Sequence, residues 1–153
     1  MYKTGTNNIK LDKRAIERLE QAMIAIKAWA GPSLREVLIF GSYARGEQHK
    51  YSSIDILVIV SESEERFIRR KADLERALNE SDILPLIDPL VYTEEEVNDL
   101  KNKMESFIIS VLKEGVAIWN GQNEIDINCL KDGSCIVKSR YAASLPDLED
   151  IYE

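Results

Sequence analysis

The sequence is poor in the residues that mark zinc-binding and secreted proteins. It has one histidine and two cysteines, Cys129 and Cys135, which form no Cys-x-x-Cys pair, and this argues against a structural zinc site. It has no run of eighteen apolar residues, so no transmembrane helix is predicted. The segment Met1–Lys10 is polar and lacks the apolar core of a secretory signal. We therefore expect a cytoplasmic protein with reduced thiols.

Positive charge is also scarce. The chain has 27 acidic and 20 basic residues and a net charge of −7. This balance argues against a protein whose main ligand is nucleic acid, because gripping a phosphate backbone needs clustered Lys and Arg. A small nucleotide is still compatible with it, since a metal ion can supply the positive charge. Residues 121–153 hold seven acids and three bases, so the acidity is concentrated there.

Amphipathic segments and capping signals predict three helices. Asp12 is placed to cap the first helix, which Gly31 is placed to end. Capping-box spacing occurs at Ser61 with Glu64 and again at Thr93 with Glu96, and each pair predicts a helix start. The predicted helices cover residues 12–30, 62–78 and 94–114.

Short apolar runs between these helices predict strands, and a short helical turn is expected at residues 41–48. Pro85 and Pro89 interrupt one strand, which predicts a place at a sheet edge or a bulge, because proline cannot donate to a ladder. Strands that alternate with helices indicate a small mixed α/β sheet with helices packed on it. The predicted strands cover residues 37–40, 54–60, 83–92 and 116–119.

The remaining residues differ in character. Residues 124–140 read as a β-hairpin around the turn signal Asp132-Gly133. In that register Cys129 faces Ile136, so the two cysteines point to opposite faces, which argues against a disulfide. The acidic segment Leu145–Glu153 is predicted to be a tail or a docking segment.

We accordingly divide the chain into a domain of residues 1–120 and an extension of residues 121–153. The extension contains the predicted hairpin and the acidic tail. The sequence contains no internal repeat.

Three residues in apolar surroundings are the candidates for chemistry. Gly41 directly follows a buried strand, where glycine allows a tight turn and close approach to a ligand, and the following helix start at Ser42 favours phosphate. Asp55 and Asp88 each lie within an apolar strand, and a buried carboxylate needs a partner such as a metal ion or an arginine. The alternatives are an ordinary strand-to-helix turn and two strand-end carboxylates that face water.

Together these segments resemble the signature of minimal nucleotidyltransferases of the DNA polymerase β superfamily. In that signature Gly-Ser is followed by ten residues, then Asp-x-Asp, with a third Asp on a later strand. Here Gly41-Ser42 is followed by ten residues and then Ser53-Ile54-Asp55, and Asp88 matches the third acid. The resemblance covers residues 11–119 and implies the nucleotidyltransferase fold, followed here by the hairpin and acidic tail.

The resemblance also implies roles for individual residues. Gly41 and Ser42 would cradle the triphosphate of ATP or another nucleoside triphosphate, and Arg45 would neutralise phosphate charge, unless it is merely solvated. Asp55 and Asp88 would ligate Mg²⁺ or Mn²⁺. Ser53 stands where the family has the first Asp of Asp-x-Asp and offers a neutral oxygen, so it is a weak or lost metal ligand.

Three functions are compatible with this pattern. The first is transfer of a nucleoside monophosphate from a nucleoside triphosphate to a hydroxyl acceptor. The resemblance implies that the acceptor can lie on a helical HEPN-type partner, as in toxin–antitoxin modules. The second is an antitoxin-like binding protein with catalysis weakened at Ser53, and the third is a nucleotide sensor without turnover. We expect a homodimer or a protein partner, because one small domain seldom supplies its own acceptor site.

Overall fold

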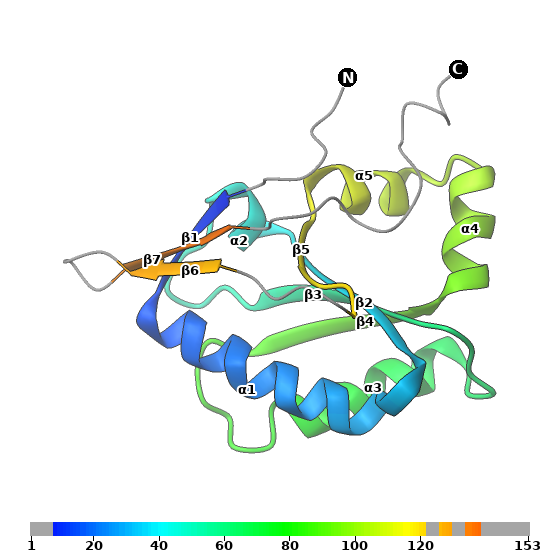
Figure 1. Ribbon diagram of the computed structural model, residues 1–153, viewed down its shortest axis with the longest axis horizontal. Helices are drawn as coiled ribbons and strands as arrows, with labels where there is room; N and C mark the ends of the chain where they lie inside the picture. The colour runs from blue at the N-terminus through cyan, green and yellow to red at the C-terminus, as the bar shows by residue number, and fades with distance from the viewer. Residues whose placement is uncertain (1–7, 122–125, 130–133, 139–153) are drawn as a thin grey trace.

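The computed structural model describes residues 8–121, 126–129 and 134–138. These residues form a four-stranded sheet in the order β4-β3-β2-β5 and a three-stranded sheet in the order β1 (Asn8–Asp12), β7 (Ser134–Lys138) and β6 (Asp126–Cys129) (Figure 1). The strands of the larger sheet are β2 (Leu34–Phe40), β3 (Ile54–Val60), β4 (Ile87–Thr93) and β5 (Val116–Trp119). The helices are α1 (Lys13–Ala30), α2 (Ser42–Arg45), α3 (Phe67–Leu78), α4 (Glu94–Asn102) and α5 (Ser106–Glu114), with the 3-10 turn η1 (Gly31–Ser33) after α1. None of these helices is long and apolar enough to cross a membrane.

The larger sheet is mixed, as the sequence predicts. β3 runs parallel to β4 and antiparallel to β2, and β2 pairs antiparallel with β5. β3 has the predicted bounds, and β4 lies at a sheet edge, which confirms the expectation from its proline. β4 starts at Ile87 instead of the predicted residue 83, and the preceding residues form a loop.

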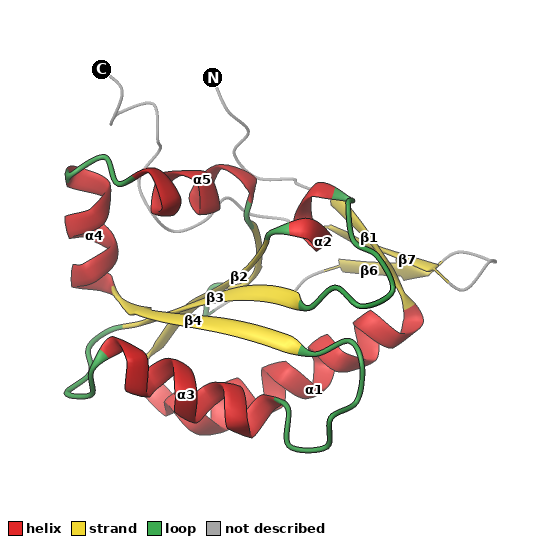
Figure 2. Ribbon diagram, turned by 180° about the vertical axis from the view of Figure 1, so that it is seen from behind, coloured by secondary structure: helices red, strands yellow, loops and turns green. Residues whose placement is uncertain are grey.

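Helices cover both faces of this sheet. α1 and α3 lie on one face, and α4 and α5 lie on the other (Figure 2). Successive residues of a strand point to opposite faces, so the apolar run of β3 supplies both cores. Ile56 and Val58 pack toward α1 and α3, whereas Leu57 and Ile59 pack toward α4 and α5. Asp55 shares the second of these faces.

The predicted limits of the helices are confirmed at some ends and wrong at others. Asp12 caps α1 by accepting a hydrogen bond from the backbone N–H of Ala15 at 2.8 Å. Thr93 and Glu96 form the predicted capping box of α4. The capping box predicted at Ser61 and Glu64 is wrong, because α3 begins at Phe67 and has no side-chain cap.

The single helix predicted for residues 94–114 is also wrong. α4 ends at Asn102, and Met104 adopts a left-handed conformation with φ 57°. The carboxylate of Glu105 then accepts hydrogen bonds from the backbone N–H groups of Phe107 and Ile108 at 3.1 and 2.8 Å. A side-chain cap inside the predicted helix therefore starts α5 as a new one.

The smaller sheet joins the two ends of the described chain. β1 (Asn8–Asp12), which the sequence does not predict, pairs antiparallel with β7 (Ser134–Lys138). Ile9 and Leu11 of β1 are 4% and 1% exposed and belong to the same core as α1. The division of the chain into a domain and an extension at residue 120 remains a prediction. Strands from both parts pair with each other in this sheet.

The predicted C-terminal hairpin is confirmed, but its register and its thiols differ from the prediction. β6 (Asp126–Cys129) pairs antiparallel with β7, and Cys129 lies opposite Cys135 instead of Ile136. A shift of one position exchanges the faces of a strand, so the expectation of free cysteines on opposite faces was wrong, and Cys135 is disulfide-bonded. The turn residues Asp132-Gly133 and the tail Leu145–Glu153 lie outside the described residues.

Candidate functional site

The strand register places the two candidate carboxylates side by side. Asp55 is the second residue of β3 and Asp88 the second residue of β4, and the two are direct partners in the parallel ladder. Phe40, the last residue of β2, is the partner of Asp55 on the other side. The site therefore lies where β2 ends and where β3 and β4 begin.

Gly41 turns the chain tightly against this carboxylate pair. Its φ is 76°, a left-handed conformation that only glycine adopts readily. A Cβ atom at this position would lie 2.1 Å from Oδ2 of Asp55. Both the backbone conformation and the contact with Asp55 therefore require glycine here.

The surroundings of Asp55 disfavour its charged form. Burial, and then the neighbouring charge of Asp88, raise the pKa of the Asp55 carboxyl from 3.8 to about 6. Glu114 adds a smaller upward contribution, while Arg45 and Lys71 oppose the shift. A cation bound beside the two aspartates would relieve this repulsion.

Asp88 has a cationic partner that the sequence does not reveal. The ammonium of Lys71, on α3, donates to Oδ1 of Asp88 at 2.6 Å and to the carbonyl of Pro89 at 3.1 Å. Lys71 lies seventeen residues before Asp88, so no local spacing rule connects the two. Its ammonium group can neutralise the negative charge of Asp88 or of a phosphate bound beside Asp88.

Arg45 forms ion pairs with two carboxylates, those of Glu47 and Glu114. Its Nε donates to Glu47 at 2.6 Å, and its Nη1 donates to Oε2 and Oε1 of Glu114 at 3.0 and 3.2 Å. The backbone N–H of Gly41 donates to the same Oε2 of Glu114. These hydrogen bonds raise the pKa of the Arg45 guanidinium, the bond to Glu47 most.

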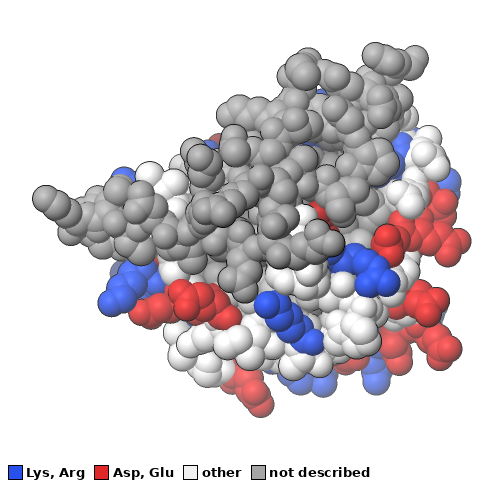
Figure 3. Space-filling model, viewed as in Figure 1, with Lys and Arg blue, Asp and Glu red and all other residues white. Residues whose placement is uncertain are grey.

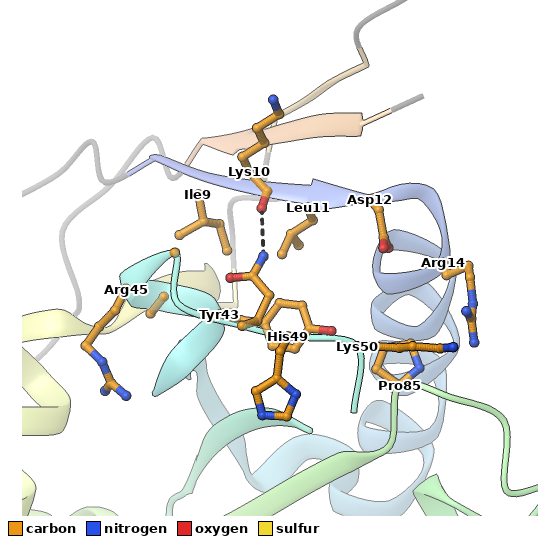
Figure 4. Close-up of a pocket in the computed structure, with 13 residues that line it drawn as sticks. Ile9, Lys10, Leu11, Asp12, Arg14, Tyr43, Arg45, His49, Lys50 and Pro85 are labelled. Atoms are coloured by element: carbon orange, nitrogen blue, oxygen red, sulfur yellow. Dashed lines mark hydrogen bonds between the residues drawn. The ribbon is translucent and has the colours of Figure 1, made fainter. Parts of the chain in front are cut away.

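A cavity of about 710 Å³ lies beside α2, on the side of β1 (Figure 4). The buried ring of Tyr43 lies between β1 and the loop that carries His49 and Lys50, while Arg45 points away from this group. Asp55 and Asp88 do not line the cavity. The candidate site is therefore centred on the carboxylate pair, and the cavity lies next to it. The charged residues of its lining are Lys10, Asp12, Arg14, Arg45 and Lys50.

Comparison with protein families decides what this arrangement belongs to. Residues 22–118 match the model of the nucleotidyltransferase domain. The chain belongs to the nucleotidyltransferase domain family. This confirms the resemblance drawn from Gly41-Ser42, Asp55 and Asp88, and it agrees with a mixed sheet covered by helices. A comparison with curated protein sequences gave no match.

Solved structures similar to this nucleotidyltransferase domain were also found. A toxin–antitoxin crystallised with AMP-PNP is 24% identical, over 67% of this chain and 74% of that chain, with a TM-score of 0.45. A mutant of the toxin–antitoxin MntA-HpeT is 23% identical over the same shares, with a TM-score of 0.44. A protein of Sulfolobus solfataricus, provisionally named a nucleotidyltransferase, is 26% identical over 73% of this chain and 92% of that chain, with a TM-score of 0.42.

The donor set of this nucleotidyltransferase domain fits one divalent cation better than two. Mg²⁺ is commonly held by one or two carboxylates together with phosphate oxygens of the substrate, and Asp55 and Asp88 provide two carboxylates in register. Among the residues that the structure describes, no three His, Cys, Asp or Glu side chains are grouped to hold a metal ion. Ser53, immediately before Ile54 and β3, contributes no charge.

The structure brings most of the sequence-predicted residues to one place. Asp55 lies beside Asp88 on one side and against Gly41 on the other, and Arg45 lies at the end of the single turn that Ser42 begins. Sequence reasoning missed Lys71 and Glu114. One signal was visible for the second: an acidic residue at the end of a helix, where the helix dipole favours basic residues.

Proposed function

We propose that the protein transfers a nucleoside monophosphate from a nucleoside triphosphate, ATP in the first instance, to a hydroxyl acceptor. One observation carries this proposal: Asp55 and Asp88 are direct partners in the strand register, and Asp55 abuts the turn at Gly41. Membership of the nucleotidyltransferase family supports the same reaction class.

Each residue of the site has a role in this proposal. Gly41 and Ser42 hold the triphosphate at the turn, and Arg45 offers a guanidinium for charge-assisted hydrogen bonds to phosphate. Asp55 and Asp88 hold Mg²⁺ or Mn²⁺. When bound, that cation neutralises the charge of the triphosphate and supports departure of pyrophosphate.

We assign the acceptor hydroxyl to a protein partner of HEPN type, with a second copy of this chain as the alternative. The family resemblance supports this assignment, and the net charge of −7 argues against nucleic acid as the main ligand. Figure 3 shows acidic side chains gathered along the edge where α4 lies, while basic side chains are scattered over the visible face. α4 itself begins with Glu94, Glu95 and Glu96.

A second candidate is nucleotide binding without transfer, in an antitoxin-like role. Ser53 favours it, because the first acid of Asp-x-Asp helps to hold the cation that activates the attacking hydroxyl in two-metal enzymes. The described residues supply two adjacent carboxylates and no group of three. The nucleotide, which brings its own phosphate oxygens, would still be held by Asp55 and Asp88.

Labelling separates these candidates. The protein is incubated with α-labelled ATP, Mg²⁺ and the purified product of the neighbouring gene, and the label on each chain is measured. Transfer by the wild type that is lost in Asp88→Asn and kept in Asp99→Asn, an exposed carboxylate of α4, supports the enzyme. Binding of ATP without label supports the second candidate, and a gain of transfer in Ser53→Asp would identify the missing ligand. No binding of ATP with Mg²⁺ at millimolar concentration refutes both.

A further inference from the structure

A carboxylate of the chain itself occupies the donors that the proposed function gives to phosphate. Oε2 of Glu114 accepts the backbone N–H of Gly41, and Nη1 of Arg45 lies 3.0 Å from the same oxygen. The second oxygen, Oε1, lies 3.2 Å from Nη1 of Arg45. A backbone N–H and a guanidinium that converge on one oxyanion are also the donors that hold a phosphate oxygen.

The helix of Glu114 does not explain its position. Glu114 is the last residue of α5, and Gly115 is its C-cap. The negative end of a helix dipole disfavours an acidic residue there. Asp55 disfavours it as well, because the two negative charges repel each other and Glu114 contributes to the raised pKa of Asp55. The hydrogen bonds to Gly41 and Arg45 offset these two costs.

We propose that Glu114 is a specificity-determining residue that makes binding of a triphosphate depend on its metal ion; this rests on the proposed function. A phosphate that reaches Gly41 and Arg45 displaces the carboxylate of Glu114, which then adds to the negative charge of Asp55 and Asp88. A bare polyphosphate brings more negative charge to this place. A triphosphate that carries Mg²⁺ brings the cation that the carboxylates attract.

Glu114 therefore selects the metal-bound nucleotide against free anions of the same shape, such as pyrophosphate or metal-free ATP. Like-charge placement of this kind is a common way to reject the wrong ligand. The selection acts on binding and needs no step of the transfer reaction.

Two neutralised carboxylates test the proposal, because Arg45 has two acidic partners. Glu114→Gln removes the charge that contacts Gly41, whereas Glu47→Gln removes an exposed charge that pairs with Arg45 alone. Binding of ATP and of pyrophosphate is measured by titration calorimetry, with Mg²⁺ and with EDTA. We expect Glu114→Gln to bind metal-free ATP and pyrophosphate about tenfold more tightly than the wild type, the worth of one charge-assisted contact. Glu47→Gln is expected to stay within about twofold.

A second variant guards against a change in folding. Glu114→Asp keeps the charge but shortens its reach by one methylene, so an affinity for metal-free ATP between those of the wild type and Glu114→Gln is expected. Equal affinities of the wild type and Glu114→Gln for metal-free ATP would overturn the inference alone, provided that the wild type binds ATP with Mg²⁺. An equal gain in Glu47→Gln would also overturn it, since the effect would then be one of overall charge. A wild type that binds no ATP with Mg²⁺ overturns the proposed function and this inference together.

Discussion

Replacing Asp55 by asparagine is expected to stabilise the protein at neutral pH while abolishing nucleotide transfer. The raised pKa means that the folded state disfavours the ionised carboxylate. A shift from 3.8 to about 6 corresponds to about 3 kcal/mol at full weight. Because the carboxyl is only half-buried, solvent screening reduces this, and we expect Asp55→Asn to raise the free energy of unfolding by about 1 kcal/mol at pH 7.

The pH dependence gives this prediction its sign. Between about pH 4 and pH 6 the folded state binds a proton at Asp55 that the unfolded state has already released. The free energy of unfolding of the wild type therefore has its full value, as far as Asp55 is concerned, below pH 4. It falls as the pH rises through 6, where the folded state also loses this proton. The difference between Asp55→Asn and the wild type should therefore be near zero at pH 4 and reach its full size at pH 7.

Urea denaturation at a series of pH values, followed by circular dichroism without metal or nucleotide, measures this difference. Asp99→Asn, on the exposed surface of α4, serves as the matched control and should show no such dependence. A variant that is less stable than the wild type at pH 7, or a difference that is the same at pH 4 and pH 7, would refute the account of Asp55 as a carboxylate strained by burial and by Asp88.

Three further substitutions test the frame around the site, each by urea denaturation. Gly41→Ala is expected to cost about 2 kcal/mol, because it forces a side chain into a left-handed conformation and against Asp55, and an unchanged stability would contradict this. Arg70→Ala should cost about 3 kcal/mol, since Arg70 is 3% exposed and its guanidinium joins α3 to β4 and α4. The control is Arg69→Ala at the exposed neighbouring residue, which should cost less than about 0.5 kcal/mol. Equal costs of the two substitutions would contradict the structural role of Arg70. Thr93→Ala removes the side-chain cap of α4 and should cost about 1 kcal/mol, whereas Thr93→Ser should recover most of it.

Local sequence was enough to predict the elements that carry the motif. The apolar run of β3, the proline of the edge strand and the capping box at Thr93 each have a local physical cause, and all three are confirmed. Asp55 and Asp88 were predicted because a charged residue within an apolar strand is conspicuous. Their direct pairing depends on the parallel register, which the spacing along the chain does not fix.

What sequence reasoning missed depends on partners that lie far away along the chain. β1 is a strand because β7 pairs with it, and the sequence of residues 8–12 alone does not predict that pairing. The hairpin register was wrong by one position, since a turn signal alone cannot fix which residues face each other. Lys71 has the sequence context of an ordinary helix surface residue, and the position of Glu114 at a helix end does not indicate its partner. Only the fold brings them to Asp88 and to Gly41.

The pairing of β1 with β7 also sets an order of events during synthesis. Residues 8–12 leave the ribosome before their partners at residues 134–138, which are made more than a hundred residues later. Until then Ile9 and Leu11 have no neighbouring strand, and closing so long a loop is slow compared with forming the local α/β contacts. The mixed sheet and its carboxylate site can therefore assemble first, and docking of the hairpin onto β1 completes the fold last.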